Sequence, residues 1–414
     1  MSAGGERAIG VWGAFDTDAL GPQIRMRVVV SELARRRPDL VVRAFAPSGA
    51  QRPFAADAGE PLEALDERFG ARMRELAAAL DLVVFSVDVG DLADDQMKLL
   101  AGPGSPARLA WHAVGIPDPL TAERAAALVK AAAHTDRISL LDDGSANRWT
   151  ASGGKAGVPA TAHPALLVPR LFASELLAAR LEFLRAIEAW PPDARVIVVQ
   201  ADAETVPEAL MRALADRPVV AMVADGRAGD AQFAGALVAR LRSARQLPPD
   251  AGTEDRVAAI AGAAGVVATS PVVREIARAF GVPNASIDAF SSRPDAAPLE
   301  QILVAPELTT DDERRIDDDL DAIAALAPVP APGALAWSEL AAARAALEAR
   351  GRRLTAERVA MADAVLADRE RVAALERRVV ELEAAYQDVR NLEVVRWRVA
   401  LGDLRTRLHL RRKR

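Results

Sequence analysis

The residues from Asp255 to Ile287, DRVAAIAGAAGVVATSPVVREIARAFGVPNASI, decide the fold class of this chain. The stretch predicts an amphipathic helix around Val257–Ala263, a buried strand at Gly265–Ala268, and a second helix that runs through Phe280. Gly281 predicts that this helix ends in the left-handed conformation, after which a new extended segment begins. Strand, helix and strand in this order indicate a parallel βαβ layer.

The loop Thr269–Val273 follows the predicted strand at its carboxyl end, where open α/β sheets bind their ligands. Thr269, Ser270 and Val273 are therefore candidate substrate-binding residues, together with Arg274 at the start of the next helix. The amides of Val273 and Arg274 at this helix start can also bind an anion without any particular side chain. The alternative is an ordinary turn of an α/β domain in which Arg274 is a solvated helix residue.

The same alternation of strands and helices extends over most of the chain. We predict strands at 8–13, 41–46, 81–87, 109–114, 138–141, 195–200 and 219–223, and helices at 24–37, 73–80, 122–133, 204–215 and 231–241. Trp190-Pro191-Pro192 separates the two series and is predicted to be a hinge. With 414 residues the chain is too long for one core, so we expect two doubly wound, Rossmann-like α/β domains.

Composition excludes several classes of chemistry. The chain has no cysteine, which excludes disulfides, thiolate metal ligands and cysteine nucleophiles. The net charge is −6, but residues 390–414 hold nine Lys/Arg against two Asp/Glu, so this end carries +7 and the rest −13. The sequence shows neither a signal segment nor a run of 18 apolar residues. We therefore expect a cytoplasmic protein, held at the inner face of the membrane if its basic end binds there.

The opening stretch resembles the last motif of the polysaccharide pyruvyl transferase family, usually T-S-L-H-G, then a helix, then A-F-G-V-P. Thr269-Ser270 and Ala279–Pro283 match at the right separation, whereas Pro271-Val272-Val273 replace Leu-His-Gly. The family's histidine is therefore Val272 in this chain. The resemblance covers roughly the first three quarters of the chain. It implies a GT-B arrangement, in which two Rossmann-like domains face each other across a cleft.

Two further segments carry the resemblance with substitutions. The family's S-V-R-D-E-x-S segment is SLLDDGS here, which keeps Asp142 and Ser145 but has Leu141 in place of the arginine. The acid of the family's D-P-A pattern is His163 in this chain, and a lone histidine beside a proline is more often structural than catalytic. Asp142 also has a simpler interpretation, as the cap of the helix that begins near Ser145.

The first loop, GAFDTDALG, stands where the family has G-N-x-G-D, and it retains Asp16 and Asp18. Capping acids of a helix N-terminal turn are an equally good interpretation of these two residues.

The resemblance implies transfer of a pyruvyl group from phosphoenolpyruvate onto a sugar of a cell-envelope glycan, which closes a cyclic ketal. It implies Asp142, Asp16 and Asp18 as catalytic residues. It also implies Ser145 as a substrate-binding residue, in addition to Arg274. No metal and no cofactor are expected, because phosphoenolpyruvate is itself the donor. Two alternatives stay open: a catalytically degenerate binding or scaffold protein of the same fold, and a glycosyltransferase that uses a nucleotide sugar.

The C-terminal part differs from the rest. We divide the chain into an N-terminal Rossmann-like domain (1–188), a C-terminal one (189–328), a linker (329–335), a coiled-coil helix (336–391) and a basic amphipathic tail (392–414). Apolar residues repeat at heptad positions from Val365 to Val389, with Val at a and Leu at d, which favours a parallel homodimer. The alternative is a single helix that folds back on the domains.

The tail combines one tryptophan, Trp397, with arginines around an apolar face, which is typical of segments that bind an anionic membrane surface. Nucleic acid is not an expected partner, because no binding module is present. Docking to a partner protein is the third option for the tail.

Overall fold

The computed structural model describes residues 8–15, 17, 19–46, 62–64, 80–92, 97, 100, 108–192, 195–225, 228–249, 251–291, 298–305, 310–328, 369, 371–375, 377–387, 396–403 and 405. The chain divides into two units, Met1–Arg344 and Ala345–Arg414, and each is described by itself.

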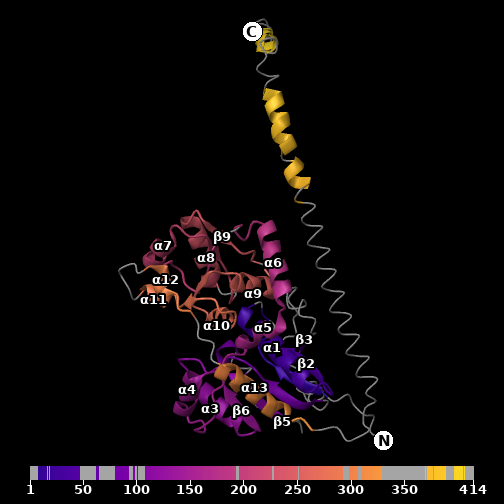
Figure 1. Ribbon diagram of the computed structural model, residues 1–414, viewed down its shortest axis with the longest axis vertical. Coiled ribbons are helices and arrows are strands. Elements are labelled where there is room, and N and C mark those ends of the chain that lie inside the picture. Colours follow the sequence, from indigo (N-terminus) through magenta and orange to yellow (C-terminus); the bar gives the residue numbers. More distant parts are fainter. Residues whose placement is uncertain are drawn as a thin grey trace, which may run out of the picture. The chain divides into compact units, whose positions relative to one another are not determined.

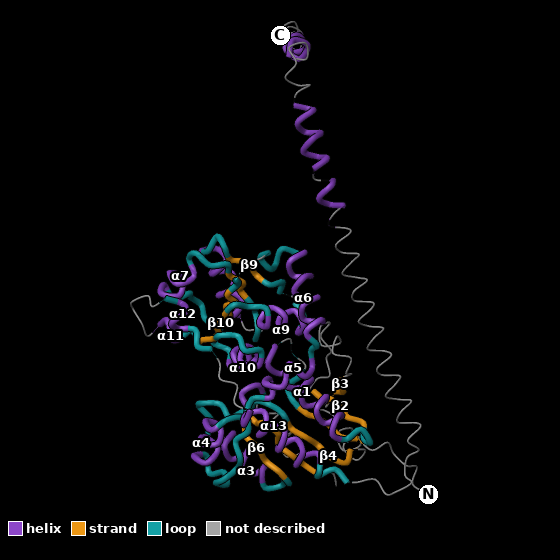
Figure 2. Tube along the Cα trace, viewed as in Figure 1, coloured by secondary structure: helices purple, strands orange, loops and turns teal. Residues whose placement is uncertain are grey.

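The first unit contains two sheets, and the first of these has six parallel strands in the order β3-β2-β1-β4-β5-β6 (Figures 1 and 2). The strands are β1 (Ala8–Trp12), β2 (Val41–Ala46), β3 (Leu62–Ala64), β4 (Leu80–Phe85), β5 (Arg108–Val114) and β6 (Arg137–Leu140). This is the strand order of the Rossmann fold, and its direction reverses between β1 and β4. Every residue of β1 is buried, because helices cover both faces of a parallel sheet.

The second sheet has five parallel strands in the order β11-β10-β7-β8-β9. They are β7 (Ile197–Gln200), β8 (Val219–Ala221), β9 (Ala244–Gln246), β10 (Gly265–Ala268) and β11 (Asn284–Ala285). Numbered within this domain, the order is again that of a Rossmann half, with the reversal between β7 and β10. The predicted pair of Rossmann-like domains is therefore confirmed, and the fold is GT-B-like.

The helices and short 3₁₀ turns connect and cover these strands. They are α1 (Leu20–Arg36), η3 (Val89–Asp91), α3 (Ala122–Ala132), α4 (Asp143–Ala151), η5 (Pro164–Leu167), α5 (Val168–Leu171), α6 (Ser174–Ala186), α7 (Glu208–Leu214), α8 (Ala228–Arg240), α9 (Thr253–Ala261), α10 (Pro271–Ala279), α11 (Asp288–Ser291), α12 (Leu299–Ile302) and α13 (Thr310–Ala324).

The stretch that decided the fold class folds as predicted. Strand β10 has the expected limits, α10 follows it directly, and Gly281 has a φ of +70°, a conformation that glycine adopts without strain. The predicted helix at 73–80 lies outside the described residues except for Leu80, which begins β4 instead.

Some predicted elements needed correction. Strands β3 and β9 were not predicted, because three residues are too few to show a period of two. Helix α8 begins at Ala228, three residues before the predicted start at 231. Helix α1 begins at Leu20, four residues before the predicted start at Ile24.

Helix α1 is buried on several sides and links the two domains. It contacts β1 and β2 of the first domain as well as α9 and α10 of the second (Figure 1). Arg27 of α1 forms a buried ion pair with Glu254 of α9, with Nη1 and Oε1 2.9 Å apart. The apolar core that contains α1 also includes residues of both sheets, such as Val84 and Val198. The two domains therefore share a hydrophobic core around this helix.

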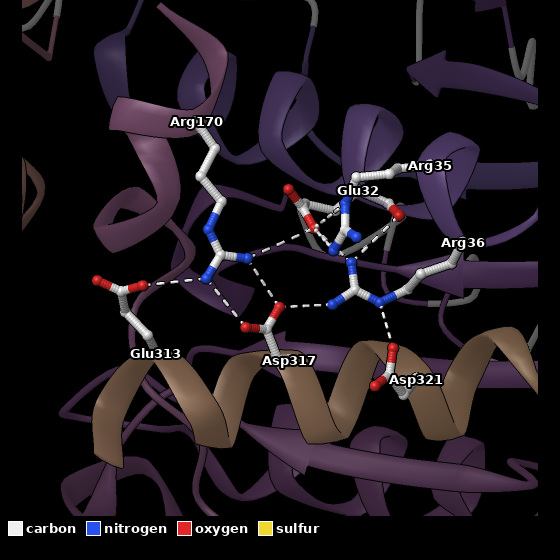
Figure 3. Close-up of polar contacts among 7 residues, drawn as sticks. All are labelled: Glu32, Arg35, Arg36, Arg170, Glu313, Asp317 and Asp321. Carbon is white, nitrogen blue, oxygen red and sulfur yellow. Dashed lines mark hydrogen bonds and ion pairs between the residues drawn. The ribbon is translucent and has the colours of Figure 1, made fainter. Parts of the chain in front are cut away.

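Helix α13 returns from the second domain to pack on α1 and β5 of the first. Figure 3 shows the ion pairs that hold it: Arg36 of α1 bonds Asp317 and Asp321 at 2.5 Å each, and Arg170 of α5 bonds Asp317 at 2.9 Å and Glu313 at 3.0 Å. The hydrogen bonds from Arg170 lower the pKa of Asp317 against the opposing effect of burial. Asp317 is therefore a carboxylate shared by two guanidinium groups.

A second polar cluster anchors the buried face of α13. Asp319 Oδ2 lies 2.7 Å from His112 Nδ1 and accepts a hydrogen bond from Ser139 Oγ, while Arg137 Nε donates to Oδ1 at 2.8 Å. Burial opposes the ionisation of Asp319, but the bonds from His112 and Ser139 and the charge of Arg137 lower its pKa. One side chain of α13 therefore satisfies groups on β5 and β6.

We predict that Asp319→Asn lowers the free energy of unfolding by about 3 kcal/mol, because removing one partner of a buried charge pair leaves the others uncompensated. The neighbouring exposed Asp318→Asn is the matched control and should change stability by less than about 0.5 kcal/mol. Urea unfolding of both variants measures the difference. Equal stabilities would show that the cluster does not anchor α13.

The second unit has helical residues at 371–375, 377–387 and 396–403. Among the described residues of this unit, large apolar side chains such as Leu375, Leu382 and Trp397 are exposed. The first half of the predicted coiled coil lies outside the described residues. In the part of the chain that is described, no helix is both long and apolar enough to cross a bilayer. Membrane binding by the tail stays a prediction.

Candidate functional site

A cavity of about 390 Å³ lies where the carboxyl ends of both sheets meet. Its walls are formed by Ala14, Thr17, Ala19, Gly21, Pro22, Arg25, Asp88, Asp91, Leu141 and His163 from the first domain, and by Asp225, Ser270, Pro271 and Val272 from the second. The loops after β1 and β4 belong to this wall, so the cavity sits at the point where the strand order of the first sheet reverses. Ligands of doubly wound sheets bind at such points.

Two helices begin at the cavity, one from each domain. The amide of Leu20, the first residue of α1, donates to the carbonyl of Ala224 in the second domain at 2.7 Å. A Cβ added at Gly21 would lie 3.1 Å from Val272 Cγ2, so the starts of α1 and α10 are in close contact. Helix N-termini carry partial positive charge, and both of these contribute to the same wall.

Arg25 places a buried cation at the wall. Its side chain is buried, and Nη1 donates to the carbonyl oxygen of Ala113 at 2.5 Å. Burial lowers the pKa of Arg25, while the charges of Asp88 and Asp91 oppose that shift. A guanidinium stays protonated under such shifts, so the cavity wall holds a permanent positive charge beside two carboxylates.

His163 faces the same cavity as a neutral imidazole. Burial, and then the charge of Arg25, lowers its pKa well below the ordinary value of 6.5. Its Nδ1 accepts a hydrogen bond from the amide of Ala165 at 3.0 Å, so Nδ1 carries no proton. The proton of the neutral ring is therefore on Nε2, and His163 can offer an N–H donor to a ligand rather than a base.

A buried polar network positions the part of the wall that the second domain contributes. Asp230 accepts from the amides of Ala224 (2.6 Å) and Asp225 (2.8 Å) and from Gln200 Nε2 (3.1 Å). Gln200 Oε1 in turn accepts from the amide of Ser270 at 2.9 Å. Burial raises the pKa of Asp230, and these hydrogen bonds oppose the rise. The network ties the loops after β8 and β10 to the end of β7, which fixes where Asp225 and Ser270 stand.

The predicted binding residues at 269–274 have different environments in the structure. Ser270 lines the cavity, and its Oγ makes a long contact of 3.4 Å to Asp225 Oδ1. Thr269 Oγ1 instead accepts from the amide of Asp202 at 3.1 Å. Val273 is part of the hydrophobic core, and Arg274 is not among the residues that line this cavity. The anion-binding roles of Val273 and Arg274 gain no support from this geometry and stay predictions.

The predicted catalytic residue Asp142 is not among the residues that line the cavity. Asp142 is the N-cap of α4, where Oδ1 accepts from the amide of Ser145 at 2.5 Å. Ser145 is buried, and its Oγ accepts from the amide of Ile116 at 3.2 Å. The simpler, capping interpretation therefore describes Asp142, whose catalytic role stays a prediction. Asp16 and Asp18 lie outside the described residues.

Sequence reasoning missed five polar residues of the wall: Thr17, Arg25, Asp88, Asp91 and Asp225. Asp88 and Asp91 directly follow the buried strand β4, and that position could have identified them. Arg25 could not have been found in this way, because it lies within a predicted helix and not at the end of a strand. In the described part of the chain, no group of three or more metal-binding side chains could hold a metal ion.

Comparisons with known proteins concern the fold. No protein-family model and no curated protein sequence matches the chain. UDP-GlcNAc 2-epimerase from Neisseria meningitidis, solved with UDP-GlcNAc, is 11% identical with a TM-score of 0.48, over 77% of this chain and 94% of that one. Anabaena HepE, solved with UDP-glucose, is 14% identical (TM-score 0.47; 78% and 95%).

A third solved structure, Escherichia coli ADP-heptose heptosyltransferase II, is 14% identical with a TM-score of 0.41, over 77% of this chain and 98% of that one. Values this low transfer no ligand or activity to this protein. The assignment of the fold rests on the strand orders of the two sheets described above.

We predict that His163 makes stability depend on pH. Between its lowered folded pKa and 6.5 the unfolded chain binds a proton that the folded protein does not, so stability falls as pH drops below 6.5. The slope from this one group approaches about 1.4 kcal/mol per pH unit.

The substitution His163→Asn removes the titrating group. The amide oxygen of the asparagine can still accept the hydrogen bond from the Ala165 amide. Urea unfolding at pH 5.5, 6.0 and 7.0 should show a shallower loss of stability for this variant than for the wild type. Parallel pH profiles would contradict the assignment of a neutral, buried imidazole.

Proposed function

We propose that this protein is a divergent pyruvyl transferase-like protein that binds phosphoenolpyruvate in the cavity between its Rossmann-like domains. One observation carries the proposal. Leu141, His163 and Val272 come from three separate segments that resemble motifs of that family, and all three line this cavity together with Ser270. Positions so far apart in the chain meet at one site, as they would if the motifs served one ligand.

The reaction sets the requirements for such a site. The two hydroxyl oxygens of a sugar diol each form a bond to C2 of phosphoenolpyruvate, and the bond from C2 to the phosphate oxygen breaks. One hydroxyl proton goes to the methylene carbon, which becomes a methyl group, and the other leaves with the phosphate. The site must therefore hold two anionic groups, supply a base for the hydroxyls and donate a proton.

The cavity wall offers a group for each requirement. The guanidinium of Arg25 and the amides of Gly21 and Val272, near the starts of α1 and α10, suit the phosphate and the carboxylate. The Nε2–H of His163 suits an oxygen of the ligand, and the carboxylate of Asp225 is our candidate base. A volume of about 390 Å³ falls within the range of small-molecule sites.

A second function, binding without transfer, is favoured by a specific observation. The arginine and histidine of the family motifs are Leu141 and Val272 here, and both present apolar side chains to the cavity. Recognition of the donor anions would then depend on Arg25 and on backbone amides. Such a site can hold a ligand while lacking groups that the family's chemistry uses, so binding and turnover have to be measured separately.

We expect calorimetric titration of the full-length protein to give a Kd for phosphoenolpyruvate below about 1 mM. Leu141→Arg combined with Val272→His should tighten binding about tenfold, because charge-assisted hydrogen bonds contribute about 1.5–3 kcal/mol. His163→Asn should weaken binding, and exposed Asp318→Asn serves as the control. UDP-glucose titrated in parallel tests the nucleotide-sugar alternative.

Phosphate release followed by ³¹P NMR, with a pyruvylation-competent glycan present, separates the two functions. Binding with phosphate release supports transfer, and binding without it supports the non-catalytic function. Heat from UDP-glucose with none from phosphoenolpyruvate at millimolar concentration would contradict both and favour a nucleotide-sugar site.

A further inference from the structure

The helical residues 371–387 of the second unit expose a regular apolar stripe. Val372, Leu375, Val379, Leu382 and Tyr386 recur at spacings of three and four, and each is between 52% and 66% exposed. Isolated helices of this length are marginal in water, and most helices gain their stability by packing an apolar face. The stripe therefore needs a partner surface of matching periodicity.

We infer that this surface is the same stripe on a second copy of the chain, paired in a parallel, in-register, two-stranded coiled coil. Val372 and Val379 take the a positions, and Leu375 and Leu382 take the d positions. β-branched residues at a with leucine at d favour two strands over three or four.

The flanking charges select the parallel orientation. Arg378 occupies the g position and Glu383 the following e position, and in a parallel pair the g residue of one helix faces that e residue of its partner. The same arginine and glutamate recur one heptad earlier in the sequence, at 371 and 376. Each contact from a g residue to the following e residue of the second copy thus brings opposite charges together, on both sides of the apolar interface.

An antiparallel pair would place g against g and e against e. Arg378 would then face arginine and Glu383 would face glutamate, which is repulsive. Within one chain, Arg378 Nη1 contacts Glu381 Oε2 at 3.0 Å, but both side chains are more than 60% exposed. An exposed pair of this kind contributes little, so it does not compete strongly with pairing across a seam.

The absence of cysteine from the chain allows a direct test. Single cysteines are introduced into the full-length protein as Val372→Cys and, separately, as Val379→Cys, and each variant is oxidised. Both should give covalent dimers in high yield, because equal a positions face each other in a parallel, in-register pair at disulfide distance. Val380→Cys, on the outer face, is the matched control and should stay largely uncrosslinked.

The result is decisive for orientation because an antiparallel pair has only one crossing point. It can crosslink at most one of the two a positions, so failure of either variant overturns the proposal. Efficient crosslinking of the Val380→Cys control would overturn it as well, since the contact would then not follow the seam.

A second experiment is sedimentation velocity on the wild-type chain, which has no cysteine, and on charge variants of it. The wild type should be a dimer, Arg378→Glu should weaken dimerisation about tenfold through like charges, and Arg378→Glu with Glu383→Arg should restore it. A monomeric wild type at tens of micromolar, a larger oligomer, or a double variant no better than the single one would each refute the proposed pairing.

Discussion

The burial of helix α1 is the constraint on which the rest of the first unit depends. Twelve of its 17 residues are buried, and they include the charged side chains Arg25, Arg27 and Glu32. Burying a charge is costly unless it is paired and hydrogen-bonded, so each of these needs a partner in fixed position. The partners come from different places: Ala113 on β5, Glu254 on α9, and the arginines of α1 and α5. One helix therefore holds the two domains together through buried charged contacts with each of them.

The position of the cavity follows from this arrangement. Because α1 starts against the loop after β8, its first turn and the first turn of α10 form one wall. Arg25 lies one turn further along the same helix, which sets the buried cation beside the carboxyl ends of β1 and β4. Helix α13 then holds α1 through the charge network in Figure 3, and Asp319 anchors α13 itself to β5 and β6. The site is thus built from elements that also carry the stability of the shared core.

The wall of the cavity combines charged and polar groups with apolar surface. A buried guanidinium, a neutral imidazole and two helix N-termini are suited to an anionic ligand, whereas Leu141 and Val272 present apolar surface. Neutral His163 has only its N–H to offer a ligand, since its other ring nitrogen already accepts from the backbone. Under the proposed function this wall binds the donor, and turnover depends on carboxylates such as Asp225.

The local pattern of the chain was enough to determine the two parallel sheets, the limits of α3 and α10, the left-handed Gly281 and the loop that contains Ser270, because periodicity and glycine chemistry act over a few neighbouring residues. The local pattern led to Arg274 as a binding residue and the family resemblance led to Asp142 as a catalytic residue. Arg274 does not line the cavity, and Asp142 caps a helix. Short strands such as β9, the early start of α1 and the grouping of Arg25, Asp88 and His163 were decided only by tertiary structure. Their environments are created by segments distant in the chain, and neither burial nor hydrogen-bond partners exist until those segments pack together.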